Sequence, residues 1–182
     1  MSYSARFLAL VLLSSTLAQA GLSGGSAPDF EVAEGAVESF GPGARLFSDR
    51  DFSVLTVPAQ LAGAQFIRTS IGREQKVVCT RPGTLFALTP ATHPENSLAE
   101  ELRNLGFEQL PEQPFQLFGT QPADKAAVFR KAIAPGESLQ TRKWIVLLAL
   151  GDIALTRPKP DRRWNANDGE TLYNGIRLPR VW

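Results

Sequence analysis

The chain has 182 residues, of which 43% are hydrophobic, with 19 basic and 18 acidic side chains and a formal net charge of +1. This near balance of charge gives no electrostatic reason to bind nucleic acid or an anionic membrane surface. The single cysteine cannot form an internal disulfide, so the fold must depend on its hydrophobic core.

Residues 1–20 have the order of a secretory signal peptide. Arg6 supplies the basic start, Phe7 to Leu13 form an uncharged apolar run, and Ala18-Gln19-Ala20 is a small-x-small cleavage site. The run is too short to span a bilayer, which takes about 20 residues, so we expect no membrane span after processing. Removing residues 1–20 takes away Arg6 and no acid, which leaves 18 basic and 18 acidic side chains. The sequence therefore predicts a secreted, extracytoplasmic protein, periplasmic or extracellular, with a neutral partner.

Residues 21–43 are predicted to form a flexible leader. This segment is rich in Gly, Ser, Ala and Pro and carries the acids Asp29, Glu31, Glu34 and Glu38. Such a composition is typical of a mobile segment near a terminus. We expect one edge strand near its end.

Residues 44–156 alternate short apolar runs with turn residues, which predicts strands. Candidate strands cover residues 45–47, 53–57, 65–69, 76–80, 84–89, 115–119, 126–132 and 143–150. Arg81-Pro82-Gly83 and Ala134-Pro135-Gly136-Glu137 have the chemistry of tight turns, and we expect the strands on either side of each turn to pair. The predicted fold class is an all-β antiparallel β-sandwich of about seven or eight strands.

One short helix is predicted after residue 97. Ser97 and Glu100 have the spacing of a capping box, and Leu98, Leu102 and Leu105 form one apolar stripe. Gly106 is a natural residue to end the helix. We expect the leucines to cover one end of the sandwich.

Residues 157–182 are predicted to be an extended tail rich in proline and arginine. Trp164 is flanked by Arg162 and Arg163, and Tyr173 follows. Flat aromatic faces bind sugars by stacking, and guanidinium groups can hold hydroxyls. Trp144 lies in an apolar run and is expected in the core.

No catalytic motif occurs in the sequence, and we assign no catalytic or metal residue. Structural zinc takes four N or S ligands, whereas the chain has one histidine, His93, and one cysteine, Cys79. Cys79 is interpreted as a buried strand residue rather than a thiol nucleophile. No cofactor is expected. A structural calcium site stays open as an alternative, and its candidate ligands are Asp49, Asp51, Asp161 and Asp168.

Residues 45–53 (RLFSDRDFS) and 55–69 (LTVPAQLAGAQFIRT) resemble the opening of an accessory β-sandwich module of secreted bacterial carbohydrate-active proteins. There, a "dRdy" stretch leads into "vP.eL.G..yirT". Similar elements occur at residues 84–89, 105–108, 115–118 and 139–148, so the resemblance covers roughly residues 45–150. It implies a non-catalytic module that accompanies glycoside hydrolases or polysaccharide lyases. Such modules adjoin a catalytic domain, so this one either stands alone or is a piece of a longer protein.

The sequence therefore favours a module that binds a polysaccharide or glycan, or assists a carbohydrate-active enzyme domain. A small secreted glycoside hydrolase or polysaccharide lyase, and a cell-surface structural or interaction protein, are the alternatives. The candidate binding residues are Trp164, Tyr173, Arg162 and Arg163. Asp49 and Arg50 form a second candidate patch, for which a turn with a solvated ion pair is the competing interpretation.

Overall fold

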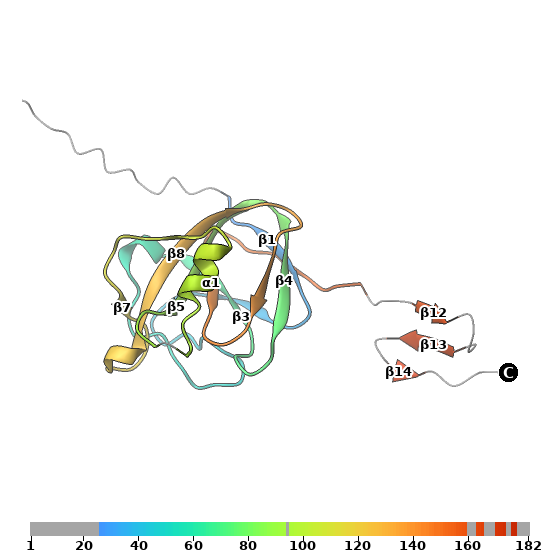
Figure 1. Cartoon of the computed structure of the whole chain (residues 1–182), viewed down its shortest axis with the longest axis horizontal. Helices are drawn as coiled ribbons and strands as arrows, with labels where there is room; N and C mark the ends of the chain where they lie inside the picture. Colours follow the sequence, from blue (N-terminus) through green and yellow to red (C-terminus); the bar gives the residue numbers. More distant parts are fainter. Residues whose placement is uncertain (1–25, 94, 160–162, 166–169, 174–175, 178–182) are drawn as a thin grey trace, which may run out of the picture.

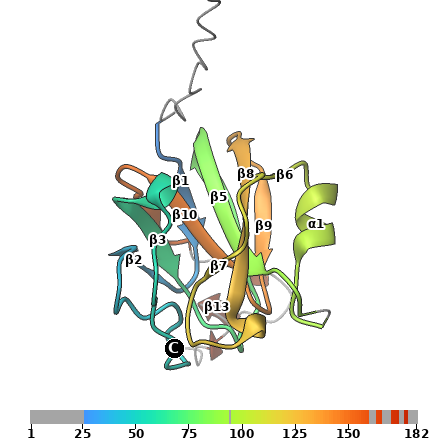
Figure 2. The same ribbon diagram turned by 90° about the vertical axis from the view of Figure 1, so that its left-hand side faces the viewer.

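Two β-sheets face each other around a shared core (Figures 1 and 2). The computed structural model describes residues 26–93, 95–159, 163–165, 170–173 and 176–177, and the predicted signal peptide lies outside them. Among the described residues, no helix has the length and apolar character needed to cross a membrane.

The larger sheet has seven strands in the order β2-β3-β10-β5-β8-β6, and β7 also pairs with β8. Its strands are β2 (Ala36–Ser39), β3 (Ala64–Arg68), β5 (Gly83–Pro90), β6 (Glu108–Gln109), β7 (Phe115–Gln116), β8 (Lys125–Ile133) and β10 (Val146–Leu150). The smaller sheet has the order β11-β1-β4-β9. Its strands are β1 (Asp29–Val32), β4 (Gln75–Arg81), β9 (Ser138–Thr141) and β11 (Leu155–Thr156). Pairing is antiparallel except between β1 and β11, which are parallel.

The larger sheet is buried on both faces, because its side chains alternate between two hydrophobic clusters. Along β5, Leu85 and Ala87 face the smaller sheet and pack in the cluster that contains Phe30. Phe86 and Leu88 enter the second cluster on the opposite face. This explains why six consecutive residues of β5 are buried.

The second cluster is covered by loops rather than by a sheet. Leu46, Phe47, Leu61 and Leu117 come from the loop segments before β3 and before β8, and each is 1% exposed or less. Trp144 is 8% exposed and stacks on Phe118 with ring centroids 4.4 Å apart. The prediction that Trp144 lies in the core is confirmed.

The all-β prediction is confirmed as a sandwich-like fold, with eleven strands in the two facing sheets. The strands predicted at 65–69, 76–80, 84–89 and 126–132 correspond to β3, β4, β5 and β8. Segments 45–47 and 53–57 form isolated bridges instead of strands: Arg45 pairs with Ser53, and Phe47 pairs with Thr69, just after β3.

The predicted pairing across the two turns is wrong. β4 pairs with β1 and β9, whereas β5 pairs with β10 and β8, so the chain changes sheets at Pro82. The second turn does form, with the Glu137 N–H donating to the Ala134 carbonyl at 3.1 Å, but it joins β8 of the larger sheet to β9 of the smaller one. Proline and glycine mark a bend in the chain, and both a hairpin and a crossing between sheets need one.

The segment predicted as a flexible leader contains β1 and the edge strand β2. β1 lies between β4 and β11, and its Phe30 and Val32 are almost fully buried. The Asp29 carboxylate accepts two hydrogen bonds from Arg81, at 2.7 and 2.8 Å. The sandwich therefore begins before residue 44, because core residues lie within this polar, glycine-rich segment.

The one α-helix among the described residues, α1 (Ala99–Asn104), lies at the position that the leucine pattern predicts. Leu98 and Leu102 are buried, Leu105 is 39% exposed, and Gly106 follows with φ +83°. The predicted capping box is replaced by two hydroxyls. Thr89 accepts a hydrogen bond from the Leu98 N–H at 2.8 Å, and Ser97 accepts one from the Ala99 N–H at 3.3 Å. Two short 3-10 helices, Ala59–Leu61 and Pro122–Asp124, complete the domain.

Three short strands follow in the segment predicted as an extended tail. They are β12 (Arg163–Asn165), β13 (Glu170–Tyr173) and β14 (Ile176–Arg177), and they pair in an antiparallel sheet of their own. The register places Trp164 opposite Thr171 and Tyr173 opposite Ile176.

Candidate functional site

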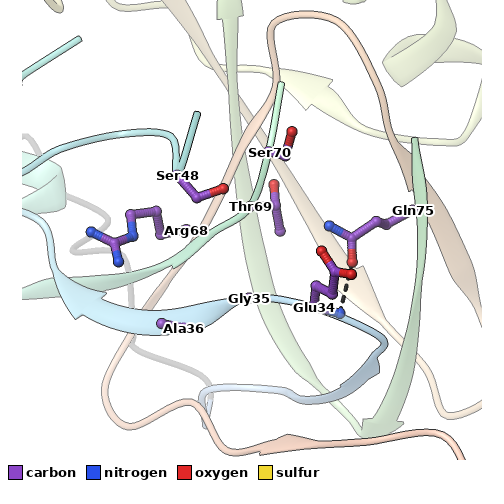
Figure 3. A pocket seen from close by; sticks show the side chains of 8 residues that line it. All are labelled: Glu34, Gly35, Ala36, Ser48, Arg68, Thr69, Ser70 and Gln75. Atoms are coloured by element: carbon purple, nitrogen blue, oxygen red, sulfur yellow. Dashed lines mark hydrogen bonds between the residues drawn. The ribbon is translucent and has the colours of Figure 1, made fainter. Parts of the chain in front are cut away.

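A polar pocket of about 250 Å³ lies where the chain crosses twice between the two sheets. One crossing leads from β1 to β2 and the other from β3 to β4, so both sheets contribute to the walls (Figure 3). The lining residues are Glu34, Gly35, Ala36, Ser48, Arg68, Thr69, Ser70 and Gln75.

The inner wall of the pocket carries a buried amide, that of Gln75, which is 7% exposed. Its Oε1 accepts a hydrogen bond from the Glu34 backbone N–H at 2.8 Å, which determines which end of the amide is the nitrogen. The Nε2 is buried and has no hydrogen-bond partner among the described residues. In Figure 3 it points into the pocket, toward Thr69. A buried donor without an acceptor costs about 1–3 kcal/mol, so this position favours a bound acceptor atom.

The outer wall, residues 33–36, is held from two sides. Gln75 binds it through the Glu34 N–H, as described above. Arg157 donates to the Val32 carbonyl at 3.1 Å and to the Gly35 carbonyl at 2.7 Å. Gly35 has φ +152°, and a Cβ there would lie 3.2 Å from the Arg68 carbonyl oxygen, so the wall approaches β3 closely. The wall is therefore shaped before any ligand arrives.

The charges around the pocket cancel. Glu34 forms an ion pair with Arg73. Arg68 forms one with Glu38, with the Arg68 Nη1 and Glu38 Oε1 atoms 2.9 Å apart. Two acids and two bases sum to zero, so the pocket has no electrostatic preference for an ionic ligand.

Asp49 organises the serine side of the pocket. Its carboxylate accepts a hydrogen bond from the Ser70 hydroxyl at 2.7 Å. It also accepts from the backbone N–H groups of Ile71 and Gly72, each at 2.9 Å. Ser48 is tied to the same segment because its N–H donates to the Thr69 carbonyl at 3.0 Å. Asp49 therefore fixes the loop that presents Ser48 and Ser70.

These hydrogen bonds control the ionisation of Asp49. Burial favours the neutral acid, but the donors of Ser70, Ile71 and Gly72 outweigh it and lower the pKa from 3.8 to about 2. A depressed pKa contributes stability above the unfolded-state value of about 4 and loses it as the pH falls through 2. The stability that depends on Asp49 is therefore complete at neutral pH.

Replacing Asp49 by asparagine is expected to lower the free energy of unfolding by about 1–2 kcal/mol at pH 7, a value reduced for solvent screening. The difference between the two proteins should shrink as the pH falls from 4 toward 2, as denaturant unfolding at each pH would measure. Asp51→Asn is the matched control, because the Asp51 side chain is 91% exposed. An effect of Asp49→Asn that did not change with pH would contradict this role.

The structure places the predicted patch of Asp49 and Arg50 beside the pocket rather than in it. Arg50 donates to the Asp49 backbone carbonyl at 2.8 Å, and its Nη1 lies 3.7 Å from the Asp49 carboxylate. Asp49 acts through Ser70, and neither Asp49 nor Arg50 lines the pocket. Trp164 and Tyr173 are on the neighbouring strands β12 and β13, Arg163 begins β12, and Arg162 lies outside the described residues.

Sequence reasoning missed Gln75, Glu34 and Arg68. Gln75 stands between Glu74 and Lys76 and reads as one more polar residue of a strand. No spacing in the sequence marks it as buried. The two crossings between sheets bring these residues together; the first lies in the segment predicted as a leader, and the second was not predicted.

Cys79 is a structural strand residue, as expected. It is 1% exposed, its Sγ–H donates to the Arg81 carbonyl at 3.0 Å, and burial raises the pKa of the thiol.

Within the described part of the chain, no group of three or more His, Cys, Asp or Glu side chains gathers in a way that could hold a metal ion. Asp161 and Asp168 lie outside it.

No family model and no curated protein matches the chain. Two solved structures are similar to it, each with a TM-score of 0.45. One is a β-glucuronidase from glycoside hydrolase family 2, at 13% identity over 66% of this chain and 14% of that one. The other is a GH138 enzyme targeting pectin rhamnogalacturonan II, at 11% identity over 71% of this chain and 17% of that one. Both are much longer proteins, and this chain spans less than a fifth of the length of either.

Proposed function

We propose that this protein is an exported, non-catalytic β-sandwich module that binds carbohydrate, alone or beside a carbohydrate-active enzyme domain. The observation that carries the proposal is the unpaired, buried Nε2 of Gln75 on the wall of a preformed polar pocket. Export is proposed from the sequence of residues 1–20.

A neutral, hydroxyl-rich ligand fits this lining. The Gln75 amide needs an acceptor, and a hydroxyl oxygen provides one. The surrounding ion pairs cancel, so nothing compensates for the desolvation of a charged ligand. Serine hydroxyls on the opposite side add further polar partners. Sugars are the extracytoplasmic ligands that present neutral hydroxyls at this density.

Binding without catalysis is favoured by the number of carboxylates in the pocket. Glycosidases of both stereochemical classes use a pair of carboxyl groups, roughly 5–10 Å apart. Among the lining residues only Glu34 is an acid, and it is paired with Arg73. The pocket can therefore hold a sugar but offers no acid–base pair to cleave its glycosidic bond.

The C-terminal strands supply a second proposed contact region. Trp164 and Tyr173 would stack on sugar rings, and Arg162 and Arg163 would bind hydroxyls. The register brings Trp164 and Tyr173 onto neighbouring strands, with Tyr173 two positions beyond the residue opposite Trp164. We propose these residues as contacts for a ligand or for an adjoining enzyme domain.

The test is binding to a panel of plant and microbial polysaccharides by affinity electrophoresis, followed by calorimetry on those that bind. Gln75→Glu removes the amide donor and keeps an oxygen for the Glu34 N–H, so we expect about a tenfold loss of affinity. Gln140→Glu makes the same chemical change on the exposed edge strand β9 and should leave affinity unchanged.

Gln75→Met removes the donor without adding charge and should weaken binding similarly. Thermal unfolding of each variant separates lost binding from lost folding. Retention of no glycan by the unaltered protein would refute the proposed function.

A further inference from the structure

We infer that the pocket recognises a single neutral sugar unit at the end of a chain, through two neighbouring hydroxyl groups that it holds in opposite hydrogen-bonding roles. This inference rests on the proposed function and specifies its ligand. One hydroxyl accepts from the Gln75 amide, and its neighbour donates to the Glu34 carboxylate.

The shape of the pocket favours an end rather than the middle of a chain. Its volume of about 250 Å³ lies just below the range of about 300–1,000 Å³ typical of small-molecule sites, so it suits one sugar ring. Gln75 and Thr69 are buried at its inner side, whereas Glu34 and Ser48 are exposed at its rim. A chain can therefore enter from the rim, but it has no exit past the inner wall.

The hydrogen-bonding roles of Gln75, Ser70 and Glu34 are set by bonds already made. The Gln75 Oε1 is taken by the Glu34 N–H, so the amide offers only its N–H donors to a ligand. The Ser70 hydroxyl hydrogen is committed to Asp49, so the Ser70 oxygen can only accept. Glu34 binds Arg73 through Oε1, which leaves Oε2 as an acceptor.

Neighbouring hydroxyls match this pattern because each can both donate and accept. A ligand that only accepts would form no hydrogen bond with the Glu34 carboxylate, and a ligand that only donates would leave the buried Gln75 amide unsatisfied. Figure 3 shows the Glu34 carboxylate close to the Gln75 amide, so one ligand can reach both. A sugar acid is disfavoured, because the ion pairs around the pocket cancel and nothing there compensates for the desolvation of a ligand carboxylate.

The experiment compares ligands of increasing length. The probes are methyl glycosides of neutral hexoses and pentoses, their singly deoxygenated analogues, and the matching oligosaccharides of two to six units, measured by calorimetry. We expect the best glycoside and its oligosaccharides to bind with affinities within about twofold of each other. Removing either of two adjacent hydroxyls should weaken binding about tenfold, and Gln75→Glu should lose the same factor for every length.

Three results would overturn the inference. An affinity that rises tenfold or more with chain length would indicate a groove, and a preference for the uronic acid would indicate a charged ligand. Glycan binding that Gln75→Glu leaves unchanged would place the ligand elsewhere and leave the proposed function standing. If no neutral glycan of any length binds, the inference and the proposed function both fail.

Discussion

A chain that begins at residue 44 is expected not to fold, whereas one that begins at Ser26 is expected to unfold cooperatively with the stability of the predicted mature protein. The shorter chain lacks β1, whose Phe30 and Val32 are 0% and 1% exposed in the core between the sheets. Burying each such side chain is worth about 1.5–3 kcal/mol. Its loss also leaves β4 and β11 without the strand that separates them.

Phe40 and the β2 pairing with β3 are lost in the same deletion. Taken together, these losses are comparable with the whole stability of a domain, about 5–15 kcal/mol. Circular dichroism and thermal unfolding of the two chains would measure the difference. Phe30→Ala in the full chain isolates the contribution of core burial and should lower the free energy of unfolding by about 3–5 kcal/mol. Cooperative unfolding of the chain from residue 44 at an unchanged midpoint would show that β1 is dispensable.

The same segment shows where sequence reasoning succeeds and where it stops. Apolar runs such as Leu85 to Leu88 predict central strands, because such residues fit a sheet that is buried on both faces. β1 has only Phe30 and Val32 as apolar residues, between acids, in a glycine-rich setting. Its burial comes from β4 and β11, which lie far away in the sequence. Tertiary pairing therefore decides what local composition cannot.

The residues that form the pocket could not be recognised from the sequence either. Asp49 was found from the sequence, but its donors, Ser70 and the amides of Ile71 and Gly72, are about twenty residues away. Gln75 becomes informative only through its burial and its unpaired nitrogen. Neither the burial of Gln75 nor its unpaired nitrogen can be recognised from the sequence, because Gln75 is one polar residue in a strand that alternates polar and apolar residues. A sequence pattern can propose a class of ligand, whereas the site depends on crossings between sheets.

Gly83→Ala is expected to destabilise the protein by about 3 kcal/mol or more, an unusually large effect for the addition of one methyl group. Gly83 is the first residue of β5, at the point where the chain changes sheets. A Cβ built there would lie 2.2 Å from the Ser26 carbonyl oxygen and 2.5 Å from the Pro28 nitrogen. Both are backbone atoms, so no side-chain rotation can relieve the clash.

Relief requires the segment 26–28 to move away, and that segment leads directly into β1. The Thr84 N–H bond to the Ser26 carbonyl, 3.2 Å long, and the ion pair of Asp29 with Arg81 would be strained together. Gly41→Ala is the matched control, because no atom lies within 4 Å of a Cβ at Gly41, and it should change stability by less than about 0.5 kcal/mol. Denaturant unfolding of both variants, with hydrogen exchange of β1 amides, would test this. If Gly83→Ala retained full stability and full protection of β1, the close approach of residues 26–28 to β5 could not be what holds the N-terminal strand in place.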